Sequence, residues 1–298
     1  AALLYVAVAH ELPVPGFVLR RAEAELARAG LTLKFGRARF DPSGKILLED
    51  VQFRVSQFQE PLLTCRVLYV RRDFWSVLGG RPVPDEIRLE GATLQLPAML
   101  SPSGTAEPLI RDLALTLRHE DRRWLVDQFN GRVGRVAVTA QGELTPPSQR
   151  TGGPPLTAAE ITTRALRLGR DAARQLHYLD DFEQPALAIQ LESPPGIGNT
   201  AHVLFTAASA NQPAGQPLVL GPMAATGTLR LDGKEHRTLR LHAAVRHANF
   251  QATYDAHEVR AIFVVDVDPD PLAVRPREAL IAAGAVSAPG IPLVGPAV

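Results

Sequence analysis

The sequence contains little of what catalytic and metal-binding sites are made from. Cys65 is the single cysteine among 298 residues, so the chain can form neither an internal disulfide nor a metal site with several cysteine ligands. Only 6% of the residues are aromatic, and the formal net charge is +1. A chain so close to neutral has no global field that would favour nucleic acid or an anionic membrane.

Sequence motifs of catalysis are also missing. The chain has no G-x-S-x-G, no Walker loop and no G-x-G-x-x-G after a strand. Four histidines lie close in sequence, but their spacing does not place them on one face of a strand: His236, His242, His247 and His257. We interpret them as scattered surface residues and not as zinc ligands.

One acidic segment begins like a calcium loop. Asp266, Asp268 and Asp270 alternate in "DVDPD", but Pro271 stands where the loop needs glycine and Arg277 where it needs glutamate. We therefore expect no EF-hand, no metal site, no cofactor and no catalytic residues. Catalysis is the poorest explanation of this sequence.

What the sequence has in quantity is alternation of apolar and polar residues, which is the period of an extended strand. The stretch from Gly30 to Val55, "GLTLKFGRARFDPSGKILLEDVQFRV", predicts a hairpin around "DPSG". Similar runs follow at Leu63-Cys65-Val67-Tyr69, Ile87-Leu89, Leu94-Leu96, Leu113-Leu115-Leu117, Val136-Val138, Leu229-Leu231, Leu239-Leu241-Ala243-Val245 and Val259-Ala261-Phe263-Val265. They predict a mostly β protein with minor α content, whose antiparallel sheet is apolar on one side.

Two segments have helical spacing instead. "FVLRRAEAELARAG" predicts an amphipathic helix ending at Gly30, which either lies at a membrane surface or caps one end of the sheet. "LTAAEITTRALRLGRDAARQLHYLDDF" predicts a long amphipathic helix with a capping box at Thr157 and Glu160, and Pro185 enforces its end. Its apolar stripe is Ile161, Ala165, Leu168, Ala172, Leu176, Leu179 and Phe182. We interpret its arginines as a solvated face, with binding of anionic head groups as the alternative.

These elements divide the chain into consecutive parts. Residues 1–30 hold the first helix and the apolar run "AALLYVAVA", which is either the remnant of a membrane anchor or a short buried segment. Residues 31–145 form a first β-sheet module, and residues 146–185 a linker and the long helix. Residues 186–298 form a continuing β-sheet module, which we expect to be truncated.

The segment from Pro15 to Pro97 resembles the start of AsmA-like proteins of the bacterial envelope. In that family a transmembrane helix is followed by a short helix ending in glycine, a strand and turn leading to "G…l.l.dv.l", and a strand ending near "l..g...p..i.l.g..l.lp". The counterparts here are Gly30, the strand from Gly44 to Phe53, the segment from Trp75 to Gly80, and the segment from Pro84 to Pro97.

The resemblance implies a long, curved sheet with a concave apolar groove, related to bridge-like lipid-transfer proteins. It implies an inner-membrane protein that faces the periplasm and shelters phospholipid on its way to the outer membrane, with envelope proteins as possible partners and no nucleic acid. An apolar groove would suit acyl chains, since each buried methylene is worth about 0.8 kcal/mol. The candidate lining residues are Leu33, Phe35, Leu48, Val51, Phe53, Val67, Tyr69, Leu89, Leu94, Leu96, Leu115 and Leu117.

Alternation separates the faces of a strand, but it does not distinguish an open groove from a closed core beneath the helix. An open groove predicts apolar surface that no other element fills. A closed sheet predicts a β-rich scaffold or interaction module that assists outer-membrane protein assembly through free strand edges. Both alternatives remain open, and neither requires a catalytic group. A third, a hydrolase or other enzyme, predicts a polar cluster with convergent geometry, which the sequence does not offer.

Overall fold

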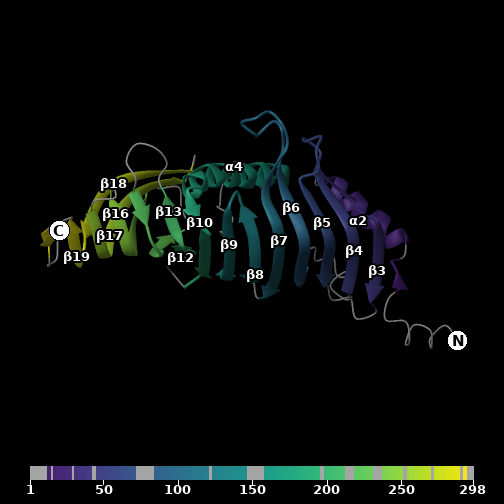
Figure 1. Cartoon of the computed structure of the whole chain (residues 1–298). Helices are drawn as coiled ribbons and strands as arrows, with labels where there is room; N and C mark the ends of the chain where they lie inside the picture. The colour runs from purple at the N-terminus through teal and green to yellow at the C-terminus, as the bar shows by residue number, and fades with distance from the viewer. Residues whose placement is uncertain are drawn as a thin grey trace. The chain divides into compact units, whose positions relative to one another are not determined.

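The fold is mostly β, as the alternating runs predict, and the strands form an open sheet (Figure 1). The computed structural model describes residues 12–14, 16–28, 30–41, 45–71, 84–120, 123–145, 158–194, 198–211, 218–230, 237–250, 254–269, 272–288 and 291–293. The run "AALLYVAVA", the segment Trp75 to Gly80, and residues Thr157, His236 and Pro271 lie outside this part.

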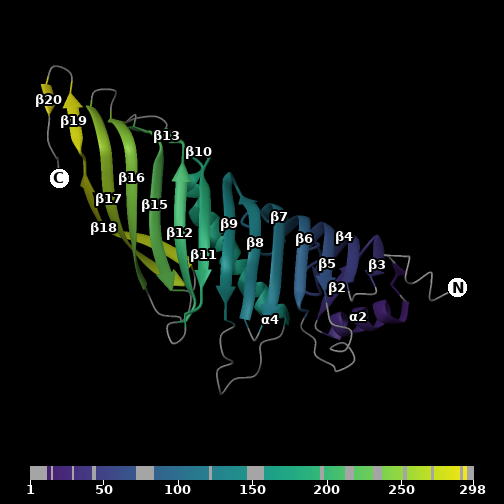
Figure 2. The ribbon, with the colours of Figure 1, turned by 90° about the horizontal axis from the view of Figure 1, so that it is seen from below.

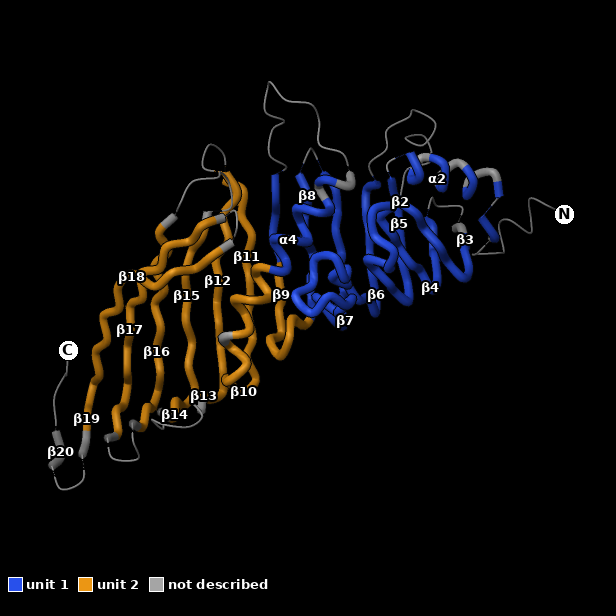
Figure 3. The backbone as a smooth tube through the Cα atoms, turned by 90° about the horizontal axis from the view of Figure 1, so that it is seen from above, with its two compact units in different colours: residues 1–131, 141–170 blue, residues 132–140, 171–298 orange. Residues whose placement is uncertain are grey.

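The chain divides into two compact units, which Figure 3 shows in different colours. Unit 1 contains residues 1–131 and 141–170, and unit 2 contains residues 132–140 and 171–298. The sequence predicts consecutive parts, with the long helix and its linker in a part of their own. In the structure, the helix is divided: its residues up to 170 belong to unit 1 and the rest to unit 2.

Unit 1 is built mainly from antiparallel strands, of which β3 to β8 lie side by side (Figure 2). Its elements are β1 (Leu12–Pro13), α2 (Gly16–Arg28), β2 (Leu31–Lys34), β3 (Arg37–Asp41), β4 (Lys45–Val55), β5 (Leu63–Arg71), β6 (Glu86–Leu96), β7 (Glu107–Glu120) and all but the last two residues of β8 (Arg123–Val133). Next come β9 (Val136–Leu144) and α4 (Ala158–Leu176), whose residues are divided between the units.

The remaining elements belong to unit 2. They are η1 (His177–Leu179), β10 (Phe182–Glu183), β11 (Ala186–Glu192), β12 (Thr200–Ala207), β13 (Ser209–Asn211), β14 (Leu218–Leu220), β15 (Met223–Arg230), β16 (Arg237–Phe250), β17 (Tyr254–Pro269), β18 (Leu272–Ala282), β19 (Ala285–Ala288) and β20 (Ile291–Leu293). The longest strand, β17, forms an antiparallel hairpin with β16, in register over most of their length.

The predicted hairpin and the first helix are confirmed, with one addition. β3 and β4 pair around "DPSG", but the first arm of the hairpin is split, so β4 pairs with both β2 and β3. Helix α2 ends at Arg28, and the Gly30 N–H donates to the Ala27 carbonyl oxygen at 3.0 Å. Gly30 has a φ of 75°, which explains why glycine follows the helix.

Residues Ala158–Leu176 form helix α4, which ends before Leu179 and Phe182 of the predicted stripe, and Phe182 lies in strand β10. The buried side of the helix also differs from the prediction. Leu166 is 3% exposed, whereas Leu168 of the predicted stripe is 49% exposed and Ala165 is also exposed. The helix approaches β7 so closely that a Cβ atom at Gly169 would lie 2.9 Å from Leu109 Cδ2. The predicted stripe was therefore wrong at Ala165 and Leu168, because packing against β7 selects the side that carries Leu166 and Gly169.

Candidate functional site

The strands of unit 1 are kinked along one row. Asp50 in β4, Gly91 in β6 and Asp112 in β7 have φ angles of 53°, 58° and 52°, in the left-handed region that residues other than glycine rarely adopt. The register places Arg66 of β5 opposite both Asp50 and Gly91. We call Asp50, Arg66, Gly91 and Asp112 the kink row. A kink adds one residue to the alternation of a strand, so residues three positions apart across it, such as Leu48 and Val51, lie on the same face.

One face of this kinked sheet is apolar from β2 to β7. Directly opposed residues of antiparallel strands share a face, and the register aligns Leu33, Phe53, Leu63, Leu94 and Ile110 in one row. Across the kink row, it aligns Ile46, Val70, Ile87 and Leu117 in a second row. All of these side chains are half-buried.

Between the two rows, apolar side chains beside the kinks bury one another. The cluster consists of Leu48, Val51, Cys65, Leu89, Ala92 and Leu113, each 8% exposed or less. We call the two rows and this cluster the apolar face. It is therefore closed along the kink row and half-open at the two rows that flank it.

Most residues predicted to line a groove lie on the apolar face. Leu48, Val51 and Leu89 belong to its buried cluster, and Leu33, Phe35 and Leu115 pack against that cluster. The register places Phe53, Leu94 and Leu117 in the two rows. Leu96 follows Leu94 on the same side of β6 and is 3% exposed.

Val67 and Tyr69 lie on the opposite, polar face, so their assignment to the lining was wrong. Val67 is opposite Glu49 of β4, and Tyr69 is opposite Arg88 of β6. The Arg88 guanidinium lies over the Tyr69 ring, 5.8 Å from its centroid. The prediction continued the alternation of β5 past the kink row, where the residues of the strand exchange faces.

The structure also adds residues to this face that simple alternation missed, such as Ile46 and Leu68, which lies opposite Leu48. A signal for the kink is present in "KILLEDVQF". Leu48 and Val51 are both buried but are separated by two residues, Glu49 and Asp50, where a regular strand would have one. In the sequence, two consecutive acidic residues between buried residues of a strand thus indicate the kink.

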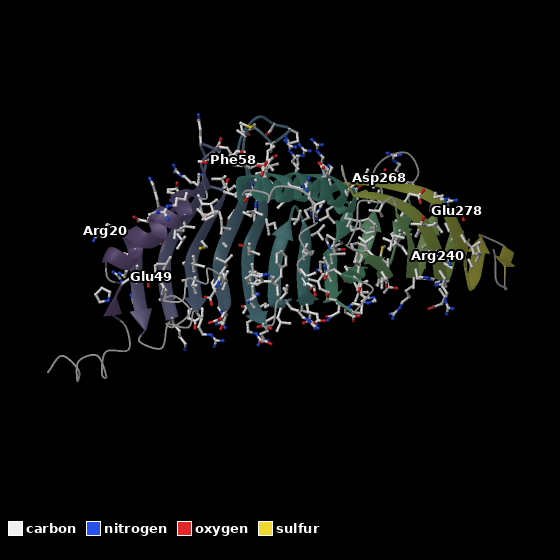
Figure 4. The ribbon with its side chains drawn as sticks, turned by 180° about the vertical axis from the view of Figure 1, so that it is seen from behind. Arg20, Glu49, Phe58, Arg240, Asp268 and Glu278 are labelled. Carbon is white, nitrogen blue, oxygen red and sulfur yellow. The ribbon has the colours of Figure 1, made fainter. Side chains whose placement is uncertain are left out.

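The polar face carries ion pairs along its strands. Arg37 and Arg39 lie 3.7 and 3.3 Å from Glu49 carboxylate oxygens, and Arg71 lies 3.5 Å from Glu86. Figure 4 labels Glu49 among these side chains. Arg37 and Arg71 are exposed and Arg39 is half-buried, so water screens these pairs and their contribution to stability is small.

The perturbed titrations in unit 1 have structural causes. Arg118 donates from Nε and Nη2 to the two oxygens of Asp127, at 2.5 and 2.8 Å, and these hydrogen bonds lower the pKa of the Asp127 carboxyl. Burial raises the pKa of the Cys65 thiol to about 11, which leaves it protonated and unreactive near neutral pH. Among the described residues, no group of three or more His, Cys, Asp or Glu side chains could hold a metal ion.

Unit 2 has an apolar face of its own. The predicted runs of β16 and β17 pair as Leu239–Val265, Leu241–Phe263, Ala243–Ala261 and Val245–Val259, and β12 and β15 continue the face through Val203, Phe205 and Ala225. Glu258 in β17 has a φ of 53°, so this unit also contains a kinked strand. The alternation predicted in the second half of the chain is confirmed at these strands.

The hairpin of unit 2 brings together two histidines that the sequence analysis kept apart. His247 and His257 are directly opposed, and their ring centroids are 5.0 Å apart. Asp255 accepts a hydrogen bond from Asn249 Nδ2 at 2.6 Å and lies 3.2 Å from His247 Nε2, and these contacts lower the pKa of its carboxyl. Spacing along one strand could not reveal this cluster, because its members meet across two strands.

The apolar face is the feature of the described residues that bears most directly on function.

No helix in the described part of the chain is long and apolar enough to cross a membrane. In comparisons with known proteins, no family model, no curated protein and no solved structure matches the chain.

Proposed function

We propose that this protein binds lipid acyl chains on its apolar face and is a non-enzymatic lipid-binding or lipid-transfer protein. The observation that carries the proposal is the continuity of the apolar face from β2 to β7, with half-buried rows on both sides of the kink row. The described strands of unit 1 belong to one sheet, so none of them forms a second sheet over this face.

The energetics favour an acyl chain as the ligand. Each methylene that leaves water contributes about 0.8 kcal/mol, so a chain that buries about ten methylenes gains about 8 kcal/mol. A row such as Leu33, Phe53, Leu63 and Leu94 offers apolar contacts across successive strands. The charged head group needs no pocket, because it can remain in water beyond the end of a row.

We place this activity in the bacterial envelope, in a protein of the inner membrane that faces the periplasm. This part of the proposal rests on the resemblance between the segment ending at Pro97 and AsmA-like proteins. Phospholipid moving toward the outer membrane is the corresponding cargo.

A β-rich scaffold that assists outer-membrane protein assembly is the second candidate, and β18 is the observation that favours it. This strand pairs with β17 and exposes Val274, Leu280 and Ile281 by 39%, 57% and 53%. Apolar side chains on an accessible strand suit the addition of a strand from a partner.

Native mass spectrometry with lipid extraction tests the proposal on protein purified gently from membranes. We expect co-purifying phospholipid in a stoichiometric amount, and its loss from the Phe53→Asp/Leu94→Asp variant, which charges one row of the apolar face. The matched control is Val67→Asp/Tyr69→Asp, which adds the same charges to the polar face of the same unit and should retain the lipid.

Circular dichroism checks that both variants remain folded. A lipid-free wild-type protein that also takes up no labelled phospholipid from vesicles would refute lipid binding and favour the scaffold. Equal loss of lipid from both variants would show that binding does not depend on the apolar face.

A further inference from the structure

Helix α4 presents an apolar side chain in the middle of its basic side. Arg164, Arg167 and Leu168 occupy positions i, i+3 and i+4, which are neighbours on a helix surface. Both arginines are exposed, and Leu168 is 49% exposed. No ion pair joins either arginine to a carboxylate among the described residues. An ordinary solvated helix face carries polar and charged side chains. This face differs because it also carries an exposed leucine.

The loop between β6 and β7 presents a second apolar side chain, Met99, which is 77% exposed. The loop is held by hydrogen bonds: the N–H groups of Leu100 and Ser101 donate to the Pro97 carbonyl oxygen, and Ser101 Oγ donates to Glu107 Oε1 at 2.5 Å. Leu100 is 8% exposed and anchors the turn. Met99 is therefore held outward by an ordered turn.

Both features lie at the same end of the unit 1 strands (Figure 1). The loop returns to the sheet at Glu107, the first residue of β7. Two residues later, Leu109 packs against α4 at Gly169, the residue that follows Leu168. The start of β7 thus links the methionine loop to the buried side of α4, next to Leu168 in the sequence.

We propose that Met99, Arg164, Arg167 and Leu168, which we call the docking patch, bind the surface of an anionic lipid bilayer. Met99 and Leu168 insert at the boundary between head groups and acyl chains, and the arginine guanidinium groups bind lipid phosphates. The charge of the patch is complementary to such a surface, although the net charge of the whole chain is only +1. The patch deepens the proposed function by indicating where lipid enters, but docking itself does not require the apolar face.

Co-sedimentation of the full chain with vesicles tests the patch. One set of vesicles is pure phosphatidylcholine, and the other is an equimolar mixture of phosphatidylcholine and phosphatidylglycerol. We expect binding to the mixed vesicles that weakens as salt is added. Arg164→Gln/Arg167→Gln should lower that affinity about 25-fold, about fivefold for each arginine. Met99→Ser/Leu168→Ser should also lower it, because the insertion is lost.

The matched control is Arg240→Gln/Arg246→Gln, which removes the same charge from exposed arginines of β16 (Arg240 is labelled in Figure 4). We expect the control to bind as the wild type does. Unchanged binding by the α4 double variant, or an equal loss in the control, would overturn the proposal. The proposal would also be overturned if the wild-type protein sediments with neither set of vesicles and the patch instead mediates contact with another protein.

The two proposals fail in different ways. Vesicle binding by a protein that neither co-purifies with lipid nor takes up labelled phospholipid would refute only lipid binding at the apolar face. Co-purified lipid in a protein that does not sediment with vesicles would refute only the docking patch. Phe53→Asp/Leu94→Asp should lose the lipid and still sediment, and Arg164→Gln/Arg167→Gln should show the reverse.

Discussion

Replacing Asp50 by valine perturbs the kink row with little change in packing. Asp50 is exposed and lies in β4 at a φ of 53°. The left-handed region costs an L-residue about 1–2 kcal/mol, and aspartate tolerates it better than β-branched residues do. We therefore expect Asp50→Val to lower the free energy of unfolding by about 1–2 kcal/mol. Asp50→Gly should be neutral or slightly stabilising, since glycine adopts this φ without strain.

Urea denaturation followed by circular dichroism measures this difference as a shift of the midpoint at constant slope. The matched control is Gln52→Val, an exposed position in the same strand with regular backbone, where valine suits a strand and should not destabilise. Equal stability of Asp50→Val and Gln52→Val would refute the kink at Asp50. The kink also directs Phe53 to the apolar face, so a variant that straightens β4 should lose bound lipid.

Two further predictions concern the buried cluster. Leu48→Ala should lower the free energy of unfolding by about 2–5 kcal/mol in urea denaturation, because it leaves a cavity beside the kink row. Leu117→Ala, at a half-buried position, should lower it clearly less. Equal losses would contradict a buried cluster along that row. For Cys65, the pKa of about 11 in the folded protein exceeds the ordinary thiol value of 9.0. The unfolded chain therefore ionises first as pH rises, so stability should be full below pH 9.0 and fall between pH 9.0 and about 11. Cys65→Ala should lack this part of the decline, and an identical pH dependence would contradict a buried thiol.

Local patterns were sufficient for the elements whose geometry depends on neighbours in sequence. Gly30 stops α2, because a left-handed residue after a helix favours glycine. The alternating runs of β16 and β17 predicted strands, and the register pairs them residue by residue, as at Leu241 and Phe263. In both cases the period of the apolar residues matches the regular backbone.

The errors arose where a distant contact or an irregular backbone intervened. Leu168 has helical spacing with the predicted stripe, yet close packing of Gly169 against Leu109 turns Leu168 to solvent. Val67 and Tyr69 continue the alternation of β5 but fall on the polar face beyond the kink row.

The sequence by itself determined that this protein is a strand-rich chain with one apolar and one polar side, because the period of two is a property of each extended segment. Only the tertiary structure decided which residues share the apolar face and where an apolar side chain meets arginines. A single left-handed residue such as Asp50 reverses the faces of a strand, and no residue type encodes that φ uniquely. The pairing of strands and the packing of α4 on β7 depend on contacts between segments far apart in the chain.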